Sequence, residues 1–176
     1  MVRGVRRVPP LPGPALTLHE RLEPLAFLLG EWWGFGVVGY PTMEESRFEQ
    51  EMSFTTDGRP FLRYESRSWL VDDDGERVRP AMSESGFWRI GEGERDVEVV
   101  LANPTGIAEV YDGEVVFRKI EIRTIGIGRT PTAKEVLGLH RLYGIVEDGD
   151  LAYAADMKGV GQDLQPHFSA KLRKIG

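Results

Sequence analysis

His167, near the carboxyl end of the chain, is the residue best suited to hold a metal ion. The chain has three histidines and no cysteine, so thiolate metal sites, iron–sulfur clusters, disulfides and cysteine nucleophiles are excluded. A neutral imidazole nitrogen is a common axial ligand of haem iron, and its second ring nitrogen then needs an orienting partner. A lone histidine on a strand is more often an ordinary structural or exposed residue than a metal ligand.

The other two histidines, His19 and His140, form no metal-ligand spacing with each other or with His167. A zinc site or a non-haem iron triad is therefore disfavoured. We expect His140 to be a structural or surface residue in a strand and His19 to be exposed.

A second feature is a glycine-rich face in the segment Gly-Glu-Trp-Trp-Gly-Phe-Gly, which begins at Gly30. Because side chains alternate along a strand, Gly30, Trp32, Gly34 and Gly36 share one face. Glycines on one face either let another backbone approach closely or leave room for a flat ligand. Both interpretations stay open at the level of the sequence.

The elements that must position these residues are strands separated by turn signals such as Asp57-Gly58 and Asp112-Gly113. The sequence predicts strands at 31–40, 44–55, 60–71, 82–90, 97–103, 106–111, 115–127, 133–147, 151–158 and 164–174. Tight connections between consecutive strands predict an all-β fold: a closed antiparallel up-and-down barrel of about ten strands, lipocalin-like. Such a barrel is wide enough to enclose a ligand cavity.

The amino-terminal part predicts a tail and one short helix. Residues 1–15 are rich in Arg and Pro and predict a flexible tail, and residues 16–176 form the barrel domain. The helical pattern covers 16–29, with Thr17 and Glu20 as a capping box. Pro24 limits it to one or two short turns, with 3₁₀ geometry as an option.

Composition narrows the class of protein further. The 176 residues suffice for one domain, and the net charge of −6 argues against nucleic acid or an anionic membrane as partner. No segment reaches the roughly 20 apolar residues of a membrane span, and the first residues lack the apolar core of a secretory signal. We expect a cytoplasmic protein.

The last predicted strand contains a conflict. Strict alternation groups His167 with Ser169 and Lys171, opposite an apolar set of Phe168, Ala170 and Leu172. If His167 points inward, the apolar set points outward, which requires a covered outer face, such as a homodimer interface, or a β-bulge.

Several segments, in this order, resemble the nitrobindins, a family of haem-binding ten-stranded barrels. The resemblance covers about residues 22–174. The matching segments are Leu25–Gly36, Tyr40–Thr42, Gly58–Tyr64, Glu84–Arg89, Pro104–Gly106 and Pro166–Leu172.

This resemblance implies one haem b per chain in the barrel mouth, with His167 as the axial ligand of a ferric iron. Thr42, Met82 and Lys134 stand where the family has residues that line the haem. It also implies nitric oxide binding and isomerisation of peroxynitrite to nitrate, with no catalytic group beyond the haem iron. An open iron position polarises the O–O bond, whose cleavage and recombination at nitrogen give nitrate.

One departure from the family concerns the distal side of the haem. Many members have a histidine where this chain has Met82. A thioether is only a weak acceptor, so an anion bound to the iron would lose a hydrogen-bond donor. Haem and nitric oxide binding are thus expected to survive more readily than isomerase activity.

Two other functions stay open. A carrier of a fatty acid or other apolar ligand would use Lys134, Arg141 or Arg173 to meet a carboxylate in the cavity. A barrel that serves only as an interaction scaffold would fill its interior with aromatic side chains.

Overall fold

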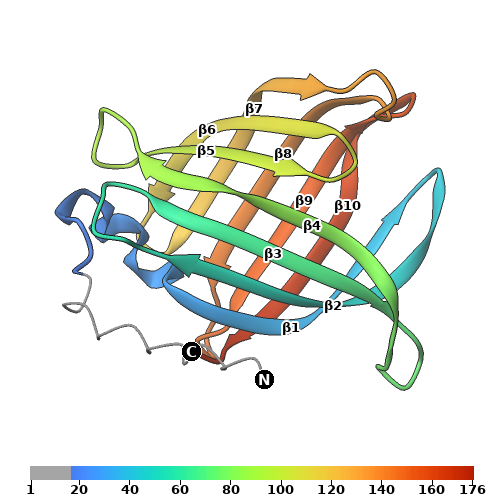
Figure 1. Cartoon of the computed structure of the whole chain (residues 1–176), viewed down its shortest axis with the longest axis horizontal. Coiled ribbons are helices and arrows are strands. Elements are labelled where there is room, and N and C mark those ends of the chain that lie inside the picture. The colour runs from blue at the N-terminus through green and yellow to red at the C-terminus, as the bar shows by residue number, and fades with distance from the viewer. Residues whose placement is uncertain (1–16) are drawn as a thin grey trace, which may run out of the picture.

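The computed structural model describes residues 17–176, so the predicted tail at 1–15 lies outside the described residues. Ten antiparallel strands form a closed barrel, in which β1 pairs with both β2 and β10 (Figure 1). This confirms the predicted up-and-down barrel. The strands are β1 (Gly30–Tyr40), β2 (Met43–Thr55), β3 (Leu62–Val71), β4 (Arg77–Ile90), β5 (Asp96–Asn103), β6 (Ile107–Val116), β7 (Lys119–Arg129), β8 (Val136–Ile145), β9 (Leu151–Gly159) and β10 (Gln162–Lys174).

The two ends of the barrel differ. The hairpins β1–β2, β3–β4, β5–β6, β7–β8 and β9–β10 all turn at one end, because consecutive strands alternate in direction. The remaining hairpins turn at the other end, where the 3₁₀ helix η1 (Glu20–Leu28) also lies (Figure 1). We call these the open end and the closed end.

The helix plugs the closed end. Leu22, Leu25 and Leu28 are fully buried there. Trp32, at the start of β1, is 2% exposed, and its indole N–H donates to the carbonyl oxygen of Leu28 at 2.8 Å. The apolar spacing of a short helix and one tryptophan thus fills the space that ten strands leave at this end.

The glycine face of β1 serves close strand packing. A Cβ atom on Gly34 would overlap the carbonyl oxygen of Lys171, and one on Gly36 would overlap that of Ser169, both on the neighbouring strand β10. Of the two interpretations of this face, the geometry supports close backbone approach, where the barrel closes, rather than room for a flat ligand.

Two local predictions were wrong. The helix is capped by His19, whose Nδ1 accepts from the backbone N–H of Arg21, and not by Thr17. Strand β6 continues through Asp112-Gly113, and the turn comes later, at Phe117, which has a positive φ of 59°. Gly113 looked like a turn residue, but it is required inside the strand because a Cβ there would overlap the carbonyl oxygen of Glu121.

Strand β4 begins at Arg77, five residues earlier than predicted, and pairs with β3 through two register shifts. Among the described residues, no helix has the length and apolar character that a membrane crossing requires.

Candidate functional site

His167 occupies a β-bulge at the open end of the barrel. Strand β10 pairs Pro166 with Asp156 and Phe168 with Ala155 of β9, so His167 is one extra residue without a partner. A bulge interrupts alternation and re-aims a side chain. The His167 ring contacts the rings of Tyr40 and Phe168, with both centroid distances at 5.2 Å.

The bulge resolves the conflict in the last strand. Ala170 and Leu172 are buried in the core and Phe168 packs against it, while His167 also meets interior side chains. Of the two alternatives, the structure has the bulge. Because Phe168, Ala170 and Leu172 point inward, these three residues do not form the apolar outer face on which a homodimer interface was expected.

Hydrogen bonding and burial determine the state of the His167 ring. Its Nδ1 lies 3.0 Å from the carbonyl oxygen of Gly39, which sits at an irregularity in β1 between Val38 and Tyr40. A carbonyl only accepts, so Nδ1 carries the proton and Nε2 keeps its lone pair. Burial, assisted by the charge of Arg141, lowers the pKa of His167 below its usual value despite this hydrogen bond. A neutral, oriented imidazole fits a haem iron.

Around His167 the open end has an apolar wall. Half-buried apolar side chains from six strands pack on the core near this end: Val38, Leu70, Ile127, Val136, Met157 and Phe168. All of them except Phe168 lie within the first or last three residues of their strands, on the side of the open end. Their exposure contrasts with the fully buried leucines of the closed end and suits a large flat apolar ligand.

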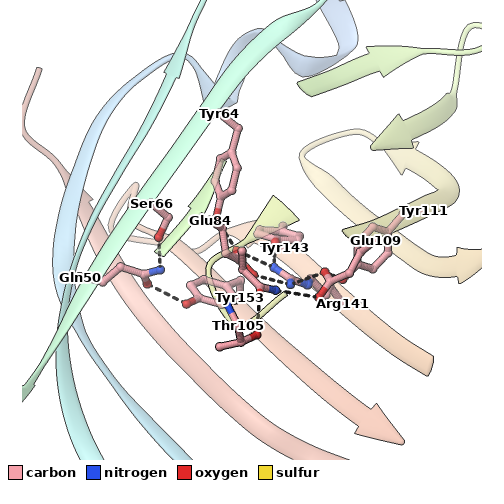
Figure 2. A network of polar contacts seen from close by, with 11 residues as sticks. Gln50, Tyr64, Ser66, Glu84, Thr105, Glu109, Tyr111, Arg141, Tyr143 and Tyr153 are labelled. Carbon is pink, nitrogen blue, oxygen red and sulfur yellow. Dashed lines mark hydrogen bonds and ion pairs between the residues drawn. The ribbon is translucent and has the colours of Figure 1, made fainter. Parts of the chain in front are cut away.

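Below this wall lies a buried ionic cluster, which Figure 2 shows. The guanidinium of Arg141 donates to both carboxylate oxygens of Glu84, at 2.6 and 3.0 Å, and to Glu109 at 3.0 Å. Tyr64 donates to Glu84 at 3.1 Å, and Tyr111 donates to Glu109 at 2.5 Å. We call Glu84, Glu109 and Arg141 the floor cluster; all three side chains are at most 8% exposed.

The floor cluster was not predicted, although the sequence contains a signal for it. Glu109 alternates with Ile107 and Tyr111 along one strand, which places an acid at a core-facing position. An acidic residue in such a position needs a buried partner. The partner, Arg141, lies two strands away on β8. Nothing in the sequence near Glu109 indicates which residue it is.

Thr42, Met82 and Lys134 lie towards the same end as His167. Thr42 is in the exposed β1–β2 turn, and Lys134 is exposed in the segment between β7 and β8. Met82 alternates with Glu84 on the inner face of β4 and is 38% exposed. Its backbone N–H donates to the hydroxyl of Ser68 at 3.0 Å.

A further cation at this end, Arg79, was not foreseen because β4 was expected to begin later. The register shifts pair Arg79 with Leu70, so both share the inner face at the rim of the barrel. Its guanidinium donates to the carbonyl oxygen of Pro80 at 3.5 Å.

The cations named for a carboxylate carrier are placed differently. The terminal nitrogens of Arg141 pair with two glutamates, whereas its buried Nε–H has no hydrogen-bond partner among the described residues. Arg173 stacks its guanidinium on Trp33, 4.6 Å from the ring centroid, and pairs in register with that residue on the outer face. His140 also faces outward, with Nε2 2.8 Å from Glu121.

Comparison with known proteins agrees with this geometry. Residues 21–174 match the family model described as THAP4-like, heme-binding β-barrel domain. A Nocardioides protein named peroxynitrite isomerase is 51% identical over 156 residues, covering 89% of this chain and 94% of the relative. A Thermobifida fusca protein named ferric nitrobindin-like protein is 41% identical, covering 90% and 96%.

A solved structure is similar as well. Rv2717c from M. tuberculosis superposes with a TM-score of 0.80 at 38% identity, covering 91% of this chain and all of the other. A family model that spans nearly the whole barrel, relatives above 40% identity and a shared fold all agree. The chain belongs to the THAP4-like haem-binding β-barrel family.

Proposed function

We propose that this chain binds one haem b at the open end of the barrel and isomerises peroxynitrite to nitrate. The observation that carries the proposal is the His167 ring, whose Nδ1 is held by Gly39 so that Nε2 keeps a free lone pair. The names of the relatives, peroxynitrite isomerase and ferric nitrobindin-like protein, support the same chemistry.

Each part of the open end has a role in this proposal. His167 supplies the axial nitrogen, and the low pKa of its ring keeps that nitrogen unprotonated near neutral pH. The apolar wall excludes water from the faces of the macrocycle. Lys134 and Arg79 supply positive charge at the rim for the propionates. When bound, a ferric haem supplies an open coordination position that polarises the substrate.

Nitric oxide binding to the ferric haem is a second activity, and Met82 favours it. A neutral diatomic ligand gains little from a hydrogen-bond donor, whereas a bound anion gains much. Met82 offers a thioether on the inner face of β4 in place of such a donor.

The carrier alternative has weaker support. Arg141 is a fully buried cation whose terminal nitrogens already donate to Glu84 and Glu109, although its Nε–H has no partner among the described residues. A fatty-acid carboxylate entering the barrel would therefore have to displace a buried ion pair, which is costly.

Haem titration of the purified protein tests the proposal. We expect a Soret band at one haem per chain, and His167→Ala should remove or shift it and abolish catalysed peroxynitrite decay in stopped-flow experiments. His140→Ala is the matched control, because that ring lies on the outer face. A spectrum unchanged in His167→Ala would reject His167 as the ligand; decay without extra nitrate would reject the isomerase.

A further inference from the structure

The floor cluster contains one cation and two carboxylates, so its charge depends on a proton. With both glutamates ionised it carries a net charge of about −1, and with one protonated it is neutral. A net charge in the interior is costly, so binding a proton relieves it.

The two glutamates are not equivalent. Burial raises the pKa of Glu84, but the charge and two hydrogen bonds of Arg141 outweigh it, and the pKa ends below the usual value. Burial also raises the pKa of Glu109, where Arg141 gives one hydrogen bond and the negative charge of Glu84 adds to the upward shift. Of the two glutamates, Glu109 is therefore the one that binds a proton more readily.

The groups that face Glu109 come from its own strand and from four others. Tyr111 lies on its own strand, Arg141 on β8 and Glu84 on β4. Strand β5 contributes an uncharged amide, Asn103, and β7 pairs the apolar Ile127 with Glu109.

Asn103 connects Glu109 to solvent. Its side-chain amide donates to Glu109 at 3.5 Å, and its amide oxygen accepts from the hydroxyl of Thr105 at 2.5 Å. Thr105 is exposed in the β5–β6 turn at the open end, and Figure 2 includes it in the network. A short chain of hydrogen-bonding groups thus runs from water to a carboxyl that is itself only 5% exposed.

The floor cluster also lies close to the ligand position. The guanidinium carbon of Arg141 is 5.4 Å from the Phe168 ring centroid, and that ring packs at 5.2 Å on the ring of His167. The charge of Arg141 contributes to the low pKa of His167, which shows that charge in the floor acts on the imidazole.

We propose that Glu109 is a proton-loading site, which takes up a proton from water that reaches it beside the polar side chains of Thr105 and Asn103 when an anion binds at the open end. The step is a protonation of the Glu109 carboxylate by water or buffer acid at the surface, and no electrons move. Proton uptake keeps the open end from holding the charge of the bound anion and a net negative charge in the floor cluster together, and so favours anion binding. The coupling to anions rests on the proposed haem binding.

Fluoride binding to the ferric haem-loaded protein tests the coupling. Calorimetry in two buffers of different ionisation enthalpy counts the protons taken up per fluoride. We expect uptake of a fraction of a proton in the unmodified protein and none in Glu109→Gln. Glu98→Gln, which changes an exposed carboxylate on the outer face, is the matched control and should behave like the unmodified protein. Equal uptake in Glu109→Gln would overturn the proposal.

Two further measurements separate this proposal from haem binding itself. Without haem, the free energy of unfolding in urea should fall as the pH rises above 4.5, because the folded state retains the Glu109 proton that the unfolded state has lost. Glu109→Gln should remove that component; identical pH profiles would refute the titration of Glu109 even if haem binds. If Glu109→Gln does not fold, Asn103→Ala serves instead: it should slow proton uptake, followed with an indicator dye, and an unchanged rate would refute the path.

Discussion

The closed and open ends of this barrel are built from the same ten strands but pack in opposite ways. At the closed end, three helix leucines and Trp32 exclude water completely. At the open end, apolar residues such as Met157 and Phe168 stay half-buried, and bulges interrupt the alternation.

This difference indicates that the closed end serves the stability of the fold and the open end serves ligand binding. Regular alternation and close backbone contacts at glycines such as Gly34 give the tight packing towards the closed end. Irregular strands at the open end place His167 and Gly39 in hydrogen-bonding contact and leave an apolar wall uncovered. Changes at the closed end should therefore alter folding, and changes at the open end should alter haem chemistry.

The largest expected effect comes from emptying the plug. Leu25→Ala removes a fully buried side chain and should lower the free energy of unfolding by about 2–5 kcal/mol in urea titration. The haem affinity of the molecules that remain folded should stay the same. Leu137→Ala, at a residue 57% exposed, is the control; an equal loss there would show that the plug is not special.

A smaller loss of stability should follow from adding a side chain where β1 packs against β10. Gly34→Ala forces a methyl group against the backbone of β10 and should cost about 1–3 kcal/mol. Gly138→Ala, where a new Cβ finds only ordinary contacts, should leave the urea midpoint nearly unchanged. If Gly34→Ala instead changed the haem spectrum and not the stability, the glycine face would belong to the ligand site.

At the open end, Met82→His should act on chemistry alone. A donor on the inner face of β4 would stabilise a bound anion, and one hydrogen bond to a charged group corresponds to about a tenfold faster peroxynitrite decay. Stability in urea should not change. An unaltered decay rate would show that this position does not face the distal side.

The smallest effect concerns the rim. Lys134→Gln should weaken binding of ferric haem by about two- to fivefold, the size of an exposed ion pair, and Arg79→Gln by a similar amount. The dimethyl ester of haem lacks the propionate charges and should show no difference. Lys119→Gln removes a positive charge at the closed end and controls for net charge. An equal loss of haem affinity in this variant would show that the rim cations do not contact the haem.

Much of the fold could be predicted because local signals were strong. Strand alternation and turn residues gave ten strands close to their observed bounds, as in β9, which was expected at 151–158 and spans Leu151–Gly159. The turn after β6 could not be placed, because a glycine required for close approach inside a strand looks the same as a glycine in a turn.

The sequence by itself determined the barrel, the class of metal ligand and His167 as its candidate, since these depend on residue type and period. Only the tertiary structure decided which way His167 faces and that Glu84, Glu109 and Arg141 form one cluster. The bulge shifts the strand register by one residue. The cluster joins side chains that lie 25 to 57 positions apart in the sequence (84 to 109 and 84 to 141). Both arise from pairing between strands, which no local pattern encodes.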